Sequence, residues 1–315
     1  GLAQLGVTGI LIPEAYGGSD LSLLDACLVS QALGHAVTPA PFLSSSILVP
    51  IALAGLEDQA VGGWLSGIAT GQLVMGAAIT EGFSIRENAG VRLENGRLYG
   101  KAMMALDAVQ ADFVLVLLDD EHLAVIHGDH EGLTTTRLLT TDATRSTAEL
   151  LLEGVEPVAV FEGRGEAIAR MFEAGRIALA ADALGASESM IGQAVSYAMD
   201  RKQFDRVIGS FQAVKHMCAE MIAELEPTRS LIWYAAHSFD TLPEDSPLMA
   251  CHALAHMSEI GREIASVSTQ VHGGIGWTDE QNLHFWFKRL GVARHLLGGP
   301  EYLRAKAAEL QGLAA

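Results

Sequence analysis

Two short segments of this chain combine residue types that can hold an anionic group. In the first, Arg201 precedes Gln203 and Phe204, and in the second the pair Gly273-Gly274 follows Val271-His272. A guanidinium presents a planar fork of donors that matches phosphate oxygens, and glycine lets a backbone approach a phosphate closely because it has no Cβ. Taken alone, the glycines are equally consistent with the C-cap of a helix and a turn.

The charge balance limits what the chain can bind. It holds 20 Lys and Arg against 38 Asp and Glu, which gives a net charge of -18. This charge repels a phosphate backbone over most of the surface, and we therefore expect no binding to nucleic acid. A phosphate-bearing cofactor requires that the few basic residues be concentrated at its site.

Cysteine and histidine spacing predicts no metal site and no disulfide framework. Cys27, Cys218 and Cys251 are scattered without CxxC spacing, which favours buried free thiols. His252 and His256 stand at i,i+4, but no HExxH-type acid lies between them. Helix packing or surface polarity is the preferred interpretation of both histidines.

The chain divides into three predicted regions. Its 315 residues, 50% of them apolar, can form a substantial core. Turn signals and helical spacing predict an N-terminal helical domain over residues 1–73. Short β-prone runs predict a small β domain over residues 74–160, and helix-compatible sequence predicts a helical bundle over residues 161–315.

Individual elements follow from periodicity and turn residues. Asn95-Gly96 is the strongest hairpin signal, because both residues tolerate positive φ. Pro227 is expected to kink or end a helix rather than to lie inside one. The predicted strands are residues 74–80, 90–93, 97–98, 113–118, 123–127 and 149–152. The predicted helices are residues 21–33, 48–63, 61–70, 168–194, 211–239 and 247–271.

The sequence gives no sign of membrane insertion or export. No run reaches the roughly 18 apolar residues that a spanning helix needs, and no basic region followed by an apolar one opens the chain. We expect a soluble, cytoplasmic protein.

The two segments together resemble the flavin-binding signature of the acyl-CoA dehydrogenase family, and residues 6–18 are similar to the N-terminal stretch of that family. The resemblance covers nearly the whole chain. It implies N-terminal helices, a small middle β domain and a C-terminal four-helix bundle. Family members carry additional helix before the position of Gly1, so a truncated, a disordered and a naturally short N-terminus are the alternatives.

The resemblance implies an FAD site shared between subunits. By motif, Arg201 would pair with the FAD pyrophosphate, Gln212 would hydrogen-bond the cofactor and Phe204 would pack beside it. The alternative for Arg201 is a surface ion pair with Asp205 at i,i+4. Gln270 would lie with the glycine pair against the ADP half of a flavin that belongs to the partner subunit.

The β domain matches the family less closely. Thr80 is the best candidate there for a flavin contact, in the place of the family's C-x-T-E strand. The segment from Gly82 to Ile85 replaces the usual P-G-x-G-S-D, and Met104-Ala105-Leu106 replaces the flavin-shielding W-x-T. The flavin contacts of this domain are therefore expected to differ from the family pattern.

The implied reaction is α,β-desaturation of an acyl-CoA thioester, on a CH-CH donor. A carboxylate removes a proton from Cα and the flavin accepts a hydride from Cβ. The implied partners are acyl-CoA, electron-transfer flavoprotein as acceptor, and related subunits in a homodimer, a homotetramer or an α₂β₂ heterotetramer. Fatty, dicarboxylic and steroid acyl groups remain open.

The catalytic carboxylate of the family is missing at both of its usual positions. The E-G-T segment that carries it lines up with Leu297-Gly298-Gly299. The second position precedes an arginine, here Arg176, which is expected to bind substrate, and it is occupied by Gly175. Neither leucine nor glycine can take up a proton.

Three explanations remain for this absence. In the first, the chain is one half of a heterotetramer whose other subunit carries the glutamate. In the second, a relocated carboxylate, Asp182 or Glu301, acts as the base. In the third, the chain binds FAD or acyl-CoA without dehydrogenation. We favour the heterotetramer, and for Asp182 we favour a structural role within the bundle. The rival from another class is a non-enzymatic helical interaction protein, in which Met217, Met221 and Leu225 form only core.

Overall fold

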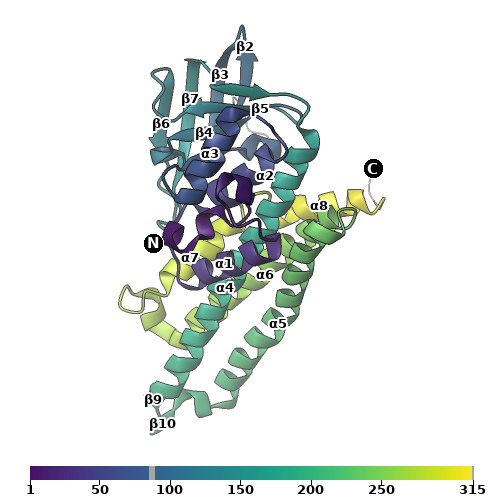
Figure 1. Ribbon diagram of the computed structural model, residues 1–315. Helices are drawn as coiled ribbons and strands as arrows, with labels where there is room; N and C mark the ends of the chain where they lie inside the picture. Colours follow the sequence, from purple (N-terminus) through teal and green to yellow (C-terminus); the bar gives the residue numbers. More distant parts are fainter. Residues whose placement is uncertain (85–88, 314–315) are drawn as a thin grey trace. The chain divides into compact units, whose positions relative to one another are not determined.

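The computed structural model describes residues 1–84 and 89–313, and its backbone groups into two compact units (Figure 1). The first unit comprises Gly1–Ala26 and Pro39–Gly175, and the second comprises Cys27–Thr38 and Arg176–Ala315. Two helices, α1 (Leu23–His35) and α4 (Gly165–Asp200), contribute residues to both units. The three-domain boundaries expected from the sequence stay a prediction, and Ile85 lies outside the described residues.

Short helices occupy the first 70 residues, as predicted. Besides α1 they are three 3₁₀-helices, a π-helix and two α-helices: Leu2–Leu5, Val7–Gly9, Glu14–Tyr16, Phe42–Leu48, α2 (Val49–Leu53) and α3 (Gln59–Thr70). The chain breaks between α2 and α3, where Gly55 takes a φ of 73°, so the continuous helix predicted over residues 48–63 is wrong. Asp58 then caps α3 by accepting hydrogen bonds from the backbone N–H groups of Ala60 and Val61 at 2.7 and 3.3 Å.

An eight-stranded sheet forms the rest of the first unit (Figure 1). Its strand order is β6-β7-β3-β1-β4-β5-β8, with β2 paired to β3, and only β1 and β4 are parallel. The strands are β1 (Met75–Ala78), β2 (Gly90–Glu94), β3 (Arg97–Leu106), β4 (Phe113–Leu117), β5 (Leu123–His127), β6 (Leu133–Arg137), β7 (Thr147–Val155) and β8 (Ala159–Phe161).

The predicted hairpin is confirmed, and two strands of this sheet were missed, as were the short strands 202–203 and 206–207 of the second unit. Asn95 and Gly96 take φ values of 50° and 76° between β2 and β3, as a type I′ turn requires. Strand β6 was missed because its run Leu133–Arg137 has one apolar residue and therefore shows no apolar alternation, although its three threonines are compatible with a strand. Strand β8 was missed because three residues are too few to show a period.

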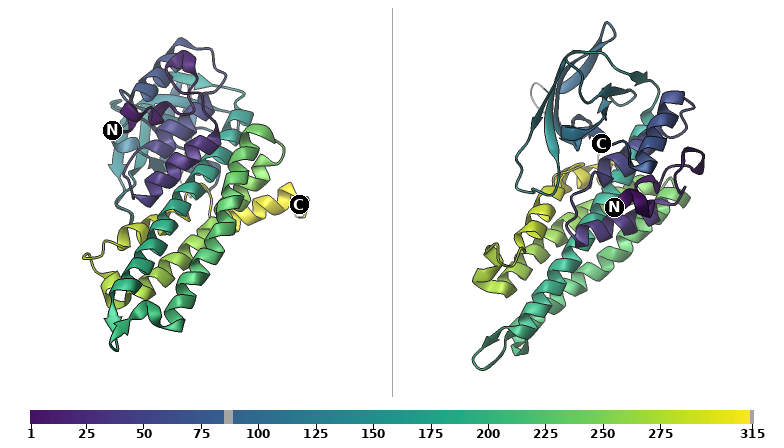
Figure 2. Two further views of the ribbon diagram at one scale, coloured as in Figure 1. Left: turned by 60° about the horizontal axis from the view of Figure 1, so that its bottom comes forward. Right: turned by 60° about the vertical axis from the view of Figure 1, so that its left-hand side comes forward.

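The second unit is a bundle of long helices. Figures 1 and 2 show α4, α5 (Gln212–Thr241) and α6 (Ser246–His272) running side by side. A hairpin of β9 (Lys202–Gln203) and β10 (Arg206–Val207) joins α4 to α5 at one end. Two shorter helices, α7 (His284–Ala293) and α8 (Pro300–Leu310), pack on α6.

Pro227 lies inside α5, so a helix boundary there, one of the two predicted alternatives, is wrong, and the other alternative, a kink, stays a prediction. Proline removes one backbone donor from a helix, but tertiary packing outweighs that loss here. Leu225 and Thr228 on either side are fully buried. The Thr228 hydroxyl also donates to the Glu224 carbonyl oxygen at 2.9 Å, which satisfies one acceptor near the proline.

Two glycines let α1 approach α4 closely within the second unit. A Cβ on Gly34 would lie 1.9 Å from the Asp182 carbonyl oxygen, and a Cβ on Gly185 would lie 1.9 Å from that of Gln31. Gln31 also donates to a carboxylate oxygen of Glu188 at 2.8 Å. The crossing therefore depends on glycine at both positions.

Neither a membrane span nor a metal cluster is found in the described parts of the chain. No helix there is both long and apolar enough to cross a membrane. No group of three or more His, Cys, Asp or Glu side chains is arranged to hold a metal ion among these residues. Cys27 and Cys251 are buried free thiols, and Cys218 is a half-buried one.

Candidate cofactor and substrate site

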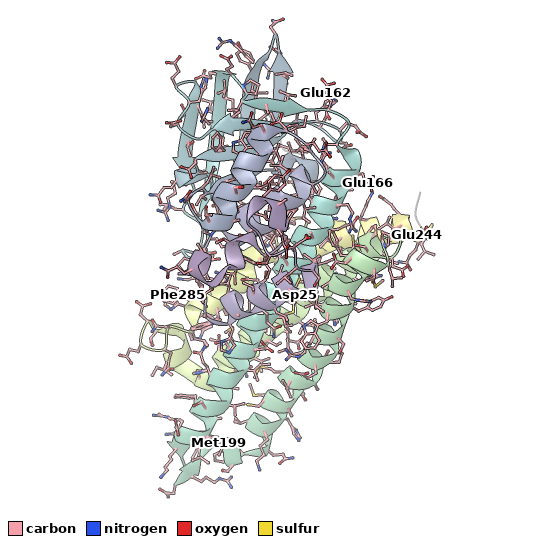
Figure 3. All side chains as sticks on the ribbon, viewed as in Figure 1. Asp25, Glu162, Glu166, Met199, Glu244 and Phe285 are labelled. Atoms are coloured by element: carbon pink, nitrogen blue, oxygen red, sulfur yellow. The ribbon has the colours of Figure 1, made fainter. Side chains whose placement is uncertain are left out.

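The two segments singled out in the sequence meet at one end of the second unit. Arg201 directly follows α4, and Gln270 lies in the last turn of α6. The ring of Tyr197, one turn before Arg201, stacks on the ring of His272 at a centroid distance of 4.8 Å. Figure 3 marks this end of α4 by Met199. Stacking thus joins the C-terminal ends of the two helices that carry the segments.

Phe204 stands at the tip of the β9–β10 hairpin in an unusual conformation. Phe204 and Asp205 form a two-residue turn and take φ values of 53° and 59°. The Phe204 side chain is 87% exposed, and its ring contacts Phe211 edge to face at 6.1 Å. The Arg206 guanidinium lies over the Phe211 ring, with its Cζ 3.9 Å from the ring centroid. An exposed aromatic residue with positive φ is costly, which suggests a role in binding.

Arg201 and Gln212 lie on either side of this hairpin. Both are exposed. Among the described residues the Arg201 guanidinium has no ion pair, so the alternative pairing with Asp205 is not formed. Gln212 begins α5, and its Nε2 lies 2.9 Å from Nε2 of His216. The Arg201 guanidinium is thus available to an anionic ligand.

The glycine pair leaves open space beside the end of α6. Gly273 takes φ 65° and ψ -143°, a combination essentially restricted to glycine. No heavy atom of the described chain lies within 4 Å of the Cβ position at Gly273 or at Gly274. Gln270 is exposed one turn earlier. A bare, accessible backbone of this kind fits the close approach of a cofactor phosphate.

In the first unit Thr80 is buried directly after β1, beside a distorted stretch of β3. A register shift separates Ala102 from Ala105, and Met104 between them takes a φ of 53°. The Glu81 carboxylate accepts a hydrogen bond from the Met103 backbone N–H at 2.9 Å. This bulge, which sequence reasoning missed, lies where the sequence departs from the family's W-x-T segment.

Arg176 connects the two positions at which the resemblance predicts the base. It follows Gly175 in α4, and its Nε donates a hydrogen bond to the Leu297 carbonyl oxygen at 3.1 Å. Leu297 is 1% exposed and takes a φ of 56°. Its neighbour Gly298 has a φ of 101°. The backbone turn at this site is thus well defined, although neither position holds a carboxylate.

Both candidates for a relocated base are engaged by arginines. The Asp182 oxygens accept three hydrogen bonds from Arg289, at 3.2, 3.0 and 2.6 Å, and both side chains are buried. Glu301 is 78% exposed and lies 3.3 Å from Arg294. The catalytic role of either residue stays a prediction.

Sequence reasoning missed one buried carboxylate near Gly175. Glu173 is 6% exposed on α4 and lies 3.1 Å from Nη1 of Arg170. The sequence signal that could have found Glu173 was its position three residues before Arg176 within an apolar helical run.

Comparison with known proteins decides the family. The family model described as "Acyl-CoA dehydrogenase, C-terminal domain" matches residues 163–310, and the model described as "Acyl-CoA dehydrogenase, N-terminal domain" matches residues 1–72. The chain belongs to the acyl-CoA dehydrogenase family. It is an oxidoreductase of the acyl-CoA dehydrogenase type, and the expected fold class is confirmed.

Similar proteins include members from mycobacteria. Acyl-CoA dehydrogenase IpdE2 of Mycobacterium tuberculosis is 30% identical over 98% of this chain and 84% of that protein. A chain of the ChsE4-ChsE5 complex from Mycobacterium tuberculosis is 27% identical, with a TM-score of 0.88 over 100% of this chain and 87% of that chain. A variant of the Tcur3481-Tcur3483 steroid ACAD is 26% identical, with a TM-score of 0.87 over 99% of this chain and 87% of that chain.

Proposed function

We propose that this chain is an FAD-binding subunit of a heteromeric acyl-CoA dehydrogenase, in which a related subunit supplies the catalytic glutamate. The complex would desaturate an acyl-CoA thioester between Cα and Cβ in the cytoplasm and pass electrons to an electron-transfer flavoprotein. Two features carry the proposal. The ends of α4 and α6, here called the cofactor end, present Arg201 and the bare backbone of Gly273-Gly274, whereas positions 175 and 297 hold no carboxylate.

The cofactor end supports FAD binding by its chemistry. The Arg201 guanidinium would hold the pyrophosphate through charge-assisted hydrogen bonds, Gln212 would hydrogen-bond the cofactor, and Phe204 would pack beside it. Gln270 and the bare backbone at Gly273-Gly274 would receive the ADP half of a flavin bound mainly by the partner subunit. The chemistry that FAD supplies there is acceptance of a hydride from Cβ.

The base site supports a division of labour between subunits. Removal of the Cα proton needs a carboxylate within hydrogen-bond reach. Gly175 and Leu297 cannot take up a proton, so neither can replace it. The Asp182 oxygens are already occupied by Arg289, and Glu301 is largely exposed to water. Both conditions disfavour a base, because a catalytic carboxylate needs free lone pairs and a desolvated setting.

The similar proteins support the same proposal. The ChsE4-ChsE5 structure is a complex of two different proteins, and the Tcur3481-Tcur3483 protein is a steroid ACAD. We therefore propose a steroid-derived acyl group, such as a degraded side chain, as the first substrate class to test, and a fatty acyl group as the second.

The test compares the chain alone with the chain co-purified with the related subunit encoded beside it. Acyl-CoA oxidation is measured with an artificial electron acceptor, and FAD content by absorbance. We expect activity only from the pair. Activity of the chain alone that Asp182→Asn or Glu301→Gln abolishes, with FAD retained, would overturn the proposal in favour of a relocated base.

A further inference from the structure

A small groove lies between α5 and α6 in the second unit, and its lining combines apolar side chains with glutamates. Its volume is about 180 Å³, less than the usual 300–1,000 Å³ of a small-molecule pocket and suited to one large apolar side chain. It is lined by Met217, Glu220, Met221, Glu224, Ile260, Glu263, Ile264 and Val267. Met221, Ile260 and Ile264 are buried, whereas Met217 and Val267 are partly exposed.

Three exposed glutamates border this groove. Glu220 and Glu224 stand at i,i+4 on α5, and Glu263 is on α6. None of the three forms an ion pair with another described residue, whereas Glu226 on the same helix is paired with Arg229. Like charges at i,i+4 repel one another, so the arrangement is unfavourable in the isolated chain. A cationic group placed over the groove would relieve that repulsion.

We propose that this groove, formed by α5 and α6, docks a helix from the related subunit. That helix would insert one large apolar side chain between Met217 and Met221 and place Lys or Arg residues, one turn away on each side, against the glutamates. Methionine suits the floor because its flexible thioether adapts to the shape of an inserted group. The inference rests on the proposed heteromer.

A second copy of this chain is the less suitable occupant. Two such grooves facing each other would bring their glutamates together, and like charges across an interface cost affinity. The net charge of -18 adds to this repulsion. The partner helix should therefore come from a chain with basic residues at this contact.

The experiment measures the affinity of this chain for the purified related subunit, by analytical ultracentrifugation at low and high salt. The variant is Glu220→Gln/Glu224→Gln/Glu263→Gln. Its matched control is Glu57→Gln/Glu131→Gln/Glu244→Gln, which removes three exposed glutamates elsewhere; Figure 3 labels Glu244 near the turn between α5 and α6. FAD content and activity of the pair are recorded in parallel.

We expect the groove variant to raise the dissociation constant about tenfold at low salt, as the loss of a few rim ion pairs would, and the control to leave it unchanged. The difference should shrink at high salt because the ion pairs are screened. We also expect the related subunit to protect Met217 from peroxide oxidation, read by mass spectrometry.

Two results would overturn the groove assignment and leave the heteromer intact: an equal affinity for variant and control, or unchanged Met217 oxidation in an active complex. Self-association of this chain that only the groove variant abolishes would assign the groove to a second copy and overturn it as well. No complex with the wild-type chain would overturn both the groove and the proposed function.

Discussion

Arg176 holds the carbonyl oxygen of Leu297 through a hydrogen bond from its Nε at 3.1 Å, and both residues are buried. The bond reaches the backbone of Leu297, so it fixes the turn whatever side chain stands there. The backbone turn at the position predicted for the family's base is therefore fixed, but the leucine there cannot accept a proton.

Restoring the carboxylate should restore proton abstraction. We expect Leu297→Glu to give an FAD-loaded chain whose flavin absorbance bleaches on anaerobic addition of acyl-CoA, because burial raises the basicity of a carboxylate at this site. Leu297→Gln, of equal size but without a base, should bind FAD and show no bleaching. Failure of the glutamate variant to bleach, with FAD and acyl-CoA both bound, would count against this site as the place of the base.

The buried pair of Asp182 and Arg289 should contribute strongly to stability. Arg289 also donates to the Thr38 carbonyl oxygen at 3.4 Å, so the pair fastens α7 and the end of α1 to α4. Asp182→Ala leaves a buried cation and should lower the free energy of unfolding in urea by about 3–5 kcal/mol. Glu301→Ala, which removes an exposed partner of Arg294, should cost about 1 kcal/mol or less. Equal effects of the two substitutions would contradict this role.

The crossing of α1 and α4 should reject any side chain at Gly34. A Cβ there would lie 1.9 Å from the Asp182 carbonyl oxygen, which is backbone and cannot rotate away. Gly34→Ala should therefore destabilise the chain by about 1–3 kcal/mol in thermal or urea unfolding. Gly192→Ala is the matched control on α4, where a Cβ meets nothing within 4 Å, and it should stabilise the helix by about 0.5–1 kcal/mol.

Phe204 should contribute to cofactor affinity and little to folding. Its side chain is 87% exposed, so Phe204→Ala should leave the melting temperature nearly unchanged. We expect it to raise the FAD dissociation constant about two- to tenfold, which corresponds to the loss of one aromatic contact of about 0.5–1.5 kcal/mol. Leu139→Ala, at a side chain 94% exposed in the first unit, should change neither quantity. An unchanged FAD titration for Phe204→Ala would remove this residue from the site.

Two of the three thiols, Cys218 and Cys27, should react in a fixed order. Burial raises the pKa of Cys27 far above its ordinary value, and the negative charge of Asp240 adds to the shift. Burial also raises the pKa of Cys218, which is nevertheless half-buried and accessible. Because the thiolate is the nucleophile, iodoacetamide at pH 8 should label Cys218 first and Cys27 only after unfolding in urea. Mass spectrometry of the labelled peptides checks this order.

Much of the fold followed from local sequence signals. Asn95-Gly96 specified its turn because the φ values that the turn needs are set by the two residues themselves. The local signal at Pro227 was misleading, because distant contacts and not the residue itself decide the structure there. Its local preference against a helix interior is weaker than the burial of Leu225 and Thr228 around it, and that burial depends on α6 and other distant parts of the chain.

The sequence by itself determined the family, the helical and strand regions and the absence of a carboxylate at positions 175 and 297, because motifs and periodicity are local properties. Only the tertiary structure decided which residues meet. It stacked Tyr197 on His272 and so joined the two segments predicted to bind the cofactor, and it set Arg289 against Asp182. These contacts join residues far apart in the chain, and their geometry depends on helix packing, which no single segment encodes.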